Sequence, residues 1–242
     1  MLYIATAAAQ QAMLAQAVNA NNLANVSTTG FKADLLAFQS LPLDDQGVSG
    51  RVYSTVDQNG VDLTPGPVTT TGQQLDVAVS GDGWLAVQSS DGTEAYTRSG
   101  SLRLTSSGTL INGSGRPVLG NGGPIAIPPA EKIEIGDDGT ISIRPEGQTP
   151  SAMVVVDRIK LVNPDQSQLV KGEDGLMRLQ DESIAAPDSG VRLISGALEM
   201  SNVNAVDAMV NMIALSRQFE AEVKLMKLAE ENDTSSTELL TI

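Results

Sequence analysis

The stretch "ANNLANVSTTGFKAD", residues 20–34, decides how this chain is organised. It follows an alanine-rich opening and precedes a segment in which apolar residues recur without a sustained period. Its row of amides and hydroxyls is too polar for a core and too patterned for a random linker. Gly30 closes the row, and Phe31 and Lys32 follow at once. We therefore predict a joint between two kinds of structure, whose meaning depends on the segments on either side.

Before the joint, residues 2–24 have the spacing of a helix with a narrow face of small side chains. No charged side chain occurs before Lys32, which favours a helix packed on several sides over a solvated surface helix. One stripe, with spacings of four and three, consists of Leu2, Thr6, Ala9, Met13, Gln16, Ala20 and Leu23, and a second consists of Ala5, Ala8, Ala12 and Ala15.

At the far end, residues 204–232 contain no glycine or proline and form a second predicted helix, with Asn204 as a suitable N-cap. Two narrow stripes at opposite ends predict a coiled coil, parallel or antiparallel, that closes the chain on itself. The alternative is two amphipathic helices that cover one sheet. The C-terminal stripe consists of Met209, Met212, Ser216, Phe219, Val223 and Met226, and Val206, Val210 and Ile213 broaden it.

Between the helices the sequence changes to short alternating runs such as "LDVAV", "WLAVQ" and "ISI", separated by "SGDG", "SSG" and "NGG". Turn residues at this spacing are typical of an antiparallel β body with tight hairpins. The predicted fold class is α+β. Its parts are a discontinuous coiled-coil domain of terminal helices at residues 1–30 and 204–242, an extended linking arm at residues 31–68, and a mainly antiparallel, β-rich outer domain at residues 69–203.

The composition excludes several classes of function. The chain has no cysteine and no histidine, which removes thiolate nucleophiles, Cys/His zinc sites, disulfides and imidazole bases. A net charge of -14 repels phosphate backbones and anionic lipids, and aromatic residues make up only 3%, so we predict no nucleic-acid partner. A run of about 18 apolar residues is missing, and so are the regions of a cleavable signal peptide, so neither membrane insertion nor cleavage is predicted.

The motifs that suggest a chemical site are explained more simply as turns. "GSGRPVLGNGG" at residues 113–123 resembles a phosphate loop, but its flanks are β and no helix follows. The "DDG" at 137–139 lacks the spacing of a calcium loop, and the "DSG" at Asp188 has no second copy. We predict no catalytic, cofactor-binding or metal-binding residue. The enzyme alternative is a glycosidase that uses Asp76 and Asp82.

Three ordered motifs resemble the axial proteins of the bacterial flagellum, the rod and hook proteins. "ANNLANVSTTGFK" at residues 20–32 is similar to their N-terminal motif. "LDVAVSGDGWLAVQ" at 75–88 and "YTRSGSLRLTSSGTLINGSGRPVLG" at 96–120 are similar to their β-domain block, and "SGALEMSNVNAVDAMVNMI" at 195–213 to their C-terminal motif. The length and the Gly-Trp-Leu at 83–85 are most similar to the proximal rod proteins, with the distal rod proteins as the alternative.

The resemblance implies a structural subunit of the flagellar basal-body rod that is not an enzyme and needs no cofactor. Its terminal helices would pair into a coiled coil lining a hollow tube that transmits torque and passes exported subunits. The implied partners are other rod subunits, with proximal rod proteins below and the distal rod protein above, in homo- and hetero-oligomeric assembly. The flagellar export apparatus would deliver the chain, without a cleaved signal peptide, to a rod crossing the periplasm. The alternative outside the family is a secreted β-rich adhesin.

In such proteins the N-terminal motif leaves the helix and lies against neighbouring subunits. The resemblance therefore implies that Asn25, Ser27 and Thr28 end the helix by bonding its freed backbone groups. Gly30 would supply a backbone geometry that is costly for other residues, and Phe31 would hold the departing arm in an apolar crevice. The predicted assembly residues are Asn22, Asn25, Thr28, Gly30, Phe31, Met209, Met212, Phe219, Val223 and Met226.

Overall fold

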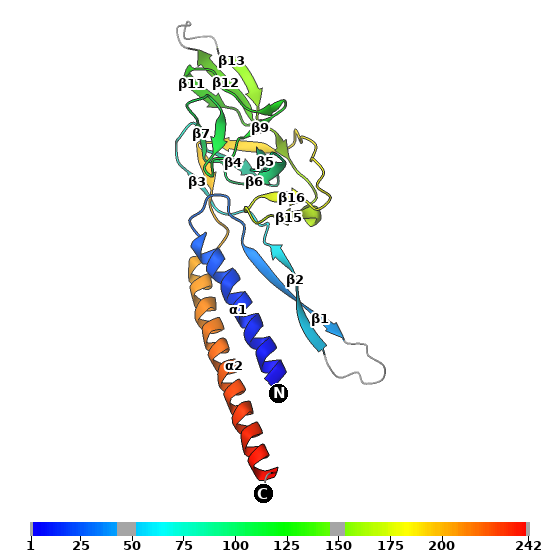
Figure 1. Ribbon diagram of the computed structural model, residues 1–242. Coiled ribbons are helices and arrows are strands. Elements are labelled where there is room, and N and C mark those ends of the chain that lie inside the picture. The colour runs from blue at the N-terminus through cyan, green and yellow to red at the C-terminus, as the bar shows by residue number, and fades with distance from the viewer. Residues whose placement is uncertain (1, 43–51, 146–152, 241–242) are drawn as a thin grey trace. The chain divides into compact units, whose positions relative to one another are not determined.

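The computed structural model describes residues 2–42, 52–145 and 153–240. Its long helices come from the two ends of the chain, and antiparallel strands fill the sequence between them (Figure 1). This confirms the α+β class with a β-rich body. The chain divides into a first unit of Met1–Val26, Asp34–Asp62 and Val203–Ile242, and a second unit of Ser27–Ala33 and Leu63–Asn202.

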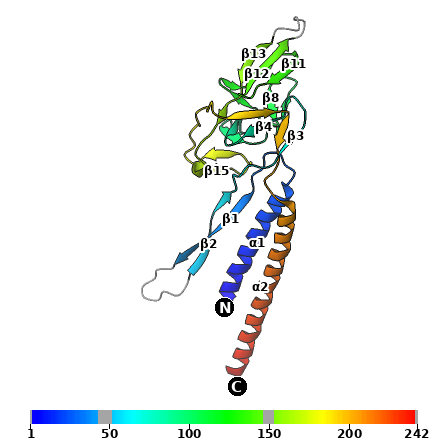
Figure 2. The same cartoon turned by 180° about the vertical axis from the view of Figure 1, so that it is seen from behind.

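The first unit pairs helix α1 (Leu2–Ala24) with helix α2 (Ala205–Leu240). The two helices lie side by side in both views (Figure 1, Figure 2). Thr6 Oγ1 lies 3.7 Å from Met226 Sδ, and Asn19 Nδ2 donates to the carbonyl oxygen of Ala208 at 2.7 Å. Because the start of one helix meets a late part of the other, the helices run antiparallel.

Small side chains allow the two helices to approach closely. Ala5, Ala9 and Ala12 are buried on α1, and Ala208 is buried on α2. Met13, predicted in the same stripe as Ala9, is instead 57% exposed. Positions 5, 9 and 12 follow one side of a helix with 3.6 residues per turn. The packed side of α1 therefore takes members from both predicted stripes.

The first unit also contains a hairpin of strands β1 (Asp34–Pro42) and β2 (Val52–Val61). The strands pair antiparallel, from Asp34 opposite Val61 to Pro42 opposite Val52. These residues belong to the predicted linking arm, and they are extended but paired with each other. Residues 43–51 of that arm lie outside the described residues. The three predicted domain boundaries stay a prediction.

The described residues of the second unit contain short strands and one 3₁₀ turn. They are β3 (Val68–Thr70), β4 (Val77–Ser80), β5 (Trp84–Gln88), β6 (Glu94–Thr97), β7 (Leu102–Leu104), β8 (Leu110–Asn112), β9 (Leu119–Gly120), β10 (Gly123–Pro124), β11 (Ala130–Ile135), β12 (Thr140–Pro145), β13 (Val154–Arg158), β14 (Leu161–Val162), η1 (Gln166–Gln168), β15 (Leu169–Lys171), β16 (Met177–Leu179), β17 (Arg192–Ser195) and β18 (Ala197–Glu199). The larger sheets have the orders β14-β5-β6-β16-β15 and β11-β12-β13, and the remaining strands pair as β3 with β18, β4 with β17, β7 with β8 and β9 with β10.

Aliphatic side chains from these strands form one core, because alternating strand residues point inward. The last strands of the unit return to its first ones. Leu193 of β17 pairs with Val79 of β4, and Leu198 of β18 pairs with Thr69 of β3. Residues 199–202 are thereby brought beside residues 64–67. Side chains at the centre of the core include Val77, Leu85, Val87, Leu110, Val118, Ile125, Ile141 and Ile159.

The motifs that suggested chemistry lie in turns. Gly115 donates its N–H to the carbonyl oxygen of Asn112 at 2.9 Å. Asp138 accepts hydrogen bonds from the N–H and the hydroxyl of Thr140, and Asp188 accepts one from the N–H of Gly190 at 2.7 Å. The prediction of turns at these positions is confirmed.

Candidate assembly residues and a buried charged cluster

Asn25 directly follows the last residue of helix α1. Its Nδ2 donates to the carbonyl oxygen of Asn21 at 3.0 Å, and its backbone N–H reaches the same oxygen at 3.1 Å. This carbonyl therefore has its ordinary helical hydrogen bond as well as one from the side chain, and it is not a freed group of the helix end. The helix-ending role of Asn25 and its contact with a neighbouring subunit both stay predictions.

Asn22 makes a pair of hydrogen bonds that imitates a peptide group. Its Nδ2 donates to the carbonyl oxygen of Asp34 at 2.9 Å, and its Oδ1 accepts from the N–H of Asp34 at 2.8 Å. Asp34 is the first residue of β1, so within the first unit this side chain joins the hairpin to α1. The structure thus gives Asn22 a partner inside the chain, and its predicted role in assembly stays a prediction.

Gly30 lies in a tight turn of the second unit, where the carbonyl oxygen of Thr28 accepts from the N–H of Phe31 at 3.3 Å. Its φ of +69° is in the left-handed region that favours glycine. An added Cβ would lie 2.3 Å from the backbone carbon of Arg98. The N–H of Gly30 donates to the carbonyl oxygen of Glu199 at 2.8 Å. The expected need for glycine is confirmed, and close backbone approach is a second reason for it.

Phe31 is held by a cation. The Nζ of Lys171 lies 4.1 Å from the centroid of the Phe31 ring and donates to the carbonyl oxygen of Lys32 at 2.9 Å. An ammonium group over an aromatic face is stabilising by about 0.5–2 kcal/mol, more when water is excluded. The resemblance implied an apolar crevice here. The contact with Lys171 was not foreseen, because a lysine that is far away in the sequence gives no local signal.

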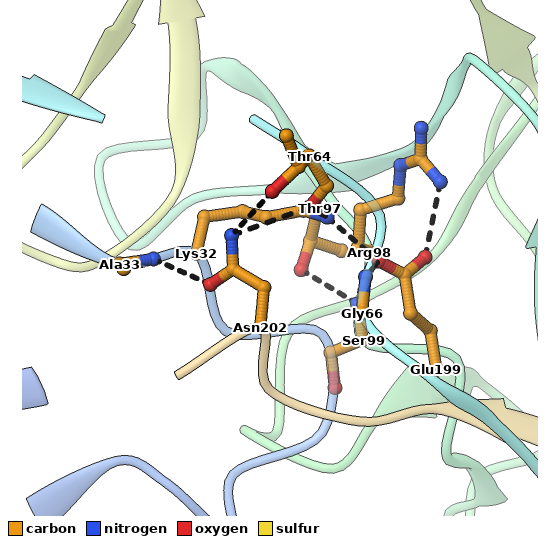
Figure 3. Close-up of polar contacts among 9 residues, drawn as sticks. All are labelled: Lys32, Ala33, Thr64, Gly66, Thr97, Arg98, Ser99, Glu199 and Asn202. Atoms are coloured by element: carbon orange, nitrogen blue, oxygen red, sulfur yellow. Dashed lines mark hydrogen bonds and ion pairs between the residues drawn. The ribbon is translucent and has the colours of Figure 1, made fainter. Parts of the chain in front are cut away.

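Beside this turn lies a group of buried polar contacts that sequence reasoning missed. Oε1 of Glu199 accepts from Lys32 Nζ at 2.7 Å and from the N–H of Gly66 at 3.0 Å. Its Oε2 accepts from Arg98 Nη1 at 3.0 Å. Figure 3 shows Lys32, Arg98 and Glu199 converging from different segments. The Glu199 cluster consists of Lys32, Thr64, Gly66, Arg98, Glu199 and Asn202.

Asn202 and Thr64 complete the Glu199 cluster. Lys32 Nζ donates to the carbonyl oxygen of Thr64 at 2.8 Å, and Asn202 Nδ2 donates to the same oxygen at 3.2 Å. Asn202 Oδ1 accepts from the N–H of Ala33 at 2.8 Å, and its own N–H donates to the carbonyl oxygen of Phe31. One amide side chain therefore joins two segments that are remote in sequence (Figure 3).

The charges of the cluster are buried and unequal in number. The side chains of Lys32, Arg98 and Glu199 are at most 3% exposed. Burying charge is costly unless it is paired and hydrogen-bonded, and here two cations share one carboxylate. The Arg98 guanidinium also lies 5.2 Å from the centroid of the Trp84 ring, while its Nε has no hydrogen-bond partner in the described part of the chain. Removing the charge of Glu199 would therefore take from two buried cations the carboxylate that both of them contact.

One sequence signal pointed to this cluster. In β18, Ala197 and Glu199 are buried and Leu198 between them is half-buried, so the acid occupies an inward position of an alternating strand. An inward-facing acid requires a buried partner, since acids are almost never fully buried unpaired. The pattern alone does not tell which cation that partner is.

The predicted residues of α2 divide between two environments. Met212, Phe219, Val223 and Met226 are half-buried and share one side of the helix with the buried Ala208. Met209 lies outside this row and is exposed. Their contacts with neighbouring subunits stay a prediction.

A second apolar row lies on the opposite side of α2, given the rotation of about 100° per residue. Val206, Val210 and Ile213 are 64%, 60% and 56% exposed, and Met209 beside them is 49% exposed. These four residues are the exposed apolar face of α2. The sequence pattern predicts one broad stripe that includes these residues and the packed ones, but among the described residues of the first unit it is the other side of α2 that packs on α1.

The enzyme alternative does not agree with the positions of its two acids. Asp76 is buried and accepts from Thr71 Oγ1 at 2.6 Å, whereas Asp82 is exposed in the turn after β4. They do not share a cleft. Among the described residues, no group of three or more His, Cys, Asp or Glu side chains is placed to hold a metal ion. Neither described helix combines the length and apolar character needed to cross a membrane.

The described residues thus form an α+β chain whose terminal helices pair and whose buried charged cluster bonds segments of the same chain. Family models match three parts of it: residues 2–32 match "Flagella basal body rod protein", residues 78–143 match "Flagellar hook protein FlgE/F/G D1 domain", and residues 194–239 match "Flagellar basal body rod FlgEFG protein C-terminal". The second match lies in the β body, and the other two include the chain ends that form α1 and α2.

Curated relatives extend the similarity over the whole chain. The flagellar basal-body rod protein FlgF of Salmonella typhimurium is 41% identical and that of Escherichia coli K12 is 42% identical, each over 100% of this chain and 98% of the relative. The flagellar basal-body rod protein FlgG of Bacillus subtilis is 33% identical over 87% of this chain and 88% of its own length. The chain belongs to the flagellar basal-body rod protein family, with full-length similarity to its FlgF members. The resemblance stated from the sequence is confirmed.

Proposed function

We propose that this chain is a structural subunit of the flagellar basal-body rod, of the FlgF type, and not an enzyme. Membership of the rod protein family supports the role. The observation that carries the mechanism is the exposed apolar face of α2, where Val206, Met209, Val210 and Ile213 lie opposite the side packed on α1. Clustered exposed apolar side chains on a soluble unit mark a surface that binds another protein.

The energetics suit assembly by repeated contacts. Burying one large aliphatic side chain contributes about 1.5–3 kcal/mol, so the four of this face contribute about 6–12 kcal/mol, which offsets the cost of ordering roughly one to two turns of helix. Met209 of this face can adapt to neighbours that are not identical, because the unbranched thioether side chain takes many shapes. The helix pair would then be a coiled-coil inner domain of residues 1–30 and 204–242, lining a hollow tube that transmits torque and passes exported subunits.

The remaining assignments follow from the same role. Residues 69–203 would form the outer domain, and residues 31–68 would link it to the inner one. The neighbours would be proximal rod proteins below and the distal rod protein above, and the flagellar export apparatus would deliver the chain uncleaved into a rod that crosses the periplasm. Full-length similarity to FlgF favours the proximal rod, and the partial similarity to the FlgG of Bacillus subtilis makes the distal rod the second candidate.

The test introduces charge into the exposed apolar face of α2. A strain lacking the gene is complemented with the chain carrying Val210→Asp and Ile213→Asp, and basal bodies are examined by electron microscopy. We expect rods to stop before completion and swimming to be lost, while the purified variant keeps the melting temperature of the wild type. Gln218→Asp, an exposed polar position on the same helix, is the matched control and should support swimming. Complete rods in the doubly charged variant would rule out assembly through this face.

A further inference from the structure

The second unit is connected to the rest of the chain through residues 27, 33, 63 and 202. The chain segments at three of these positions, 33, 63 and 202, lie next to one another inside the unit. Asn202 bonds to Ala33 and Thr64, and Lys32 bonds to Thr64 and Glu199. The Glu199 cluster thus holds together the segments by which the chain enters and leaves the unit (Figure 3).

Two glycines allow the backbones to approach closely at this point. An added Cβ at Gly30 would lie 2.3 Å from the backbone of Arg98, and one at Gly66 would meet the carbonyl oxygen of Met200. The backbone N–H groups of both glycines are used as donors to Glu199, at its carbonyl oxygen and its Oε1 respectively. The buried ion pairs and the close backbone contacts therefore join the same segments of the chain.

Because the covalent path from Ser27 to Asn202 runs through nearly the whole second unit, a force that separates these two residues is not carried first by the backbone. It is carried by the direct contacts between residues 30–33 and residues 199–202. At the start of such a separation the two cations move away from the carboxylate while all three are still shielded from water, and a buried charge separated from its partner is costly. An apolar contact is non-directional and tolerates the same displacement better.

We propose that the Glu199 cluster is a mechanical clasp, which keeps the entry and exit segments of the second unit together when force acts through the two ends of the chain. Glu199 is its central positioning residue, because it accepts from both cations and from the backbone of Gly30 and Gly66. The relevance to rotation rests on the proposed function in the rod. The clasp itself is testable on the isolated chain.

The test pulls on single molecules in a chosen direction. The chain has no cysteine, so two engineered cysteines are the only thiols available for attachment. Force applied through Ser27→Cys and Val203→Cys acts across the Glu199 cluster. The exposed pair Ser106→Cys with Gln168→Cys loads the same unit along a path that does not end at the cluster. We expect Glu199→Gln to raise the unfolding rate at constant force at least tenfold in the first direction and less than threefold in the second.

Matched controls separate a clasp from general stability. Glu131→Gln removes a partner of Arg144 in an exposed ion pair of the same unit and should change neither rate. If Glu199→Gln does not fold, Lys32→Met is used, since it leaves Glu199 paired with Arg98, and it should show the same direction dependence with a smaller factor. Equal acceleration in both directions, or none in the first, would overturn the proposal.

The same variants separate this inference from the proposed function. In cells, Lys32→Met should allow complete rods to form but reduce swimming in viscous medium at least twofold more than in dilute medium. Unchanged swimming at high viscosity together with normal rods would overturn the role of the clasp in rotation and leave the rod assignment intact. Loss of assembly by charge in the exposed apolar face of α2 tests the rod assignment without touching the cluster.

Discussion

Helix α2 of the first unit exposes large apolar side chains, whereas the Glu199 cluster of the second unit buries three charged ones. The apolar face is non-directional, and another apolar surface of suitable shape satisfies it. The cluster is directional, because each donor needs an acceptor at a particular place. The first unit is therefore suited to contacts outside the chain and the second to closing the chain on itself.

The largest difference between the two regions is expected in the rates of amide hydrogen exchange in the dilute monomer. The amides of Gly30, Gly66 and Asn202 donate to acceptors beside the cluster and should open only with the whole second unit. The amides of α2 beyond Met226 should exchange roughly a hundredfold faster or more, because α2 is 36 residues long, α1 only 23, and Thr6 already lies opposite Met226. Equal protection in both regions would remove the distinction between a self-contained and an assembly-dependent unit.

Substitution of Glu199 should have the largest effect on stability. Glu199→Gln removes the carboxylate charge that two buried cations contact and should lower the free energy of unfolding by about 3–5 kcal/mol. Lys32→Met should cost less, because the carboxylate keeps Arg98, and the double variant should be far from additive. Urea unfolding, followed by the fluorescence of the single tryptophan, Trp84, measures all three. Additive losses would mean that Lys32 and Glu199 do not act as a pair.

Gly30 comes next in expected magnitude. Gly30→Ala adds a Cβ in the left-handed region, at 2.3 Å from the backbone of Arg98, so the neighbouring segment must move. We expect a loss of about 2–3 kcal/mol in urea unfolding. Gly72→Ala is the matched control, since Gly72 also has a positive φ but an added Cβ there meets nothing within 4 Å. If Gly30→Ala and Gly72→Ala lower the free energy of unfolding equally, the close backbone approach at Gly30 does not contribute to the loss.

The same contrast explains what the sequence could and could not predict. The helices and hairpins were predictable because glycine-free spacing and glycine-rich turns are local patterns. The Glu199 cluster was not, since Lys32 and Arg98 are 167 and 101 residues away from Glu199. The direction of the helix pair and the side of α1 that packs were likewise set by contacts between the two ends of the chain, as the exposure of Met13 illustrates.

A smaller loss in the free energy of unfolding is expected from substitution at an ion pair away from the Glu199 cluster. The hydrogen bond from Arg178 holds the pKa of Asp174 well below its usual range, and Ser89 contributes a further bond. A carboxylate with a lowered pKa stabilises the fold above its unfolded pKa and loses that contribution as pH falls. Asp174→Asn should therefore lower the free energy of unfolding by about 1 kcal/mol at pH 7, with the difference narrowing below about pH 4. A constant difference across this range would show that packing, not charge, is responsible.

The smallest effect on the isolated chain is expected at Asn25, and it bears most directly on the predicted assembly motif. Its side chain makes an exposed hydrogen bond to Asn21, so Asn25→Ala should cost only about 0.5 kcal/mol in thermal unfolding. Asn22→Ala should cost more, about 1–2 kcal/mol, because two partly buried bonds to Asp34 are lost. If the side chains of Asn22 and Asn25 act only inside the chain, the variant that loses more stability should also swim less well. If Asn25→Ala abolishes rods while the monomer is nearly unchanged, the side chain acts between subunits, and the outward role argued for α2 extends to the end of α1.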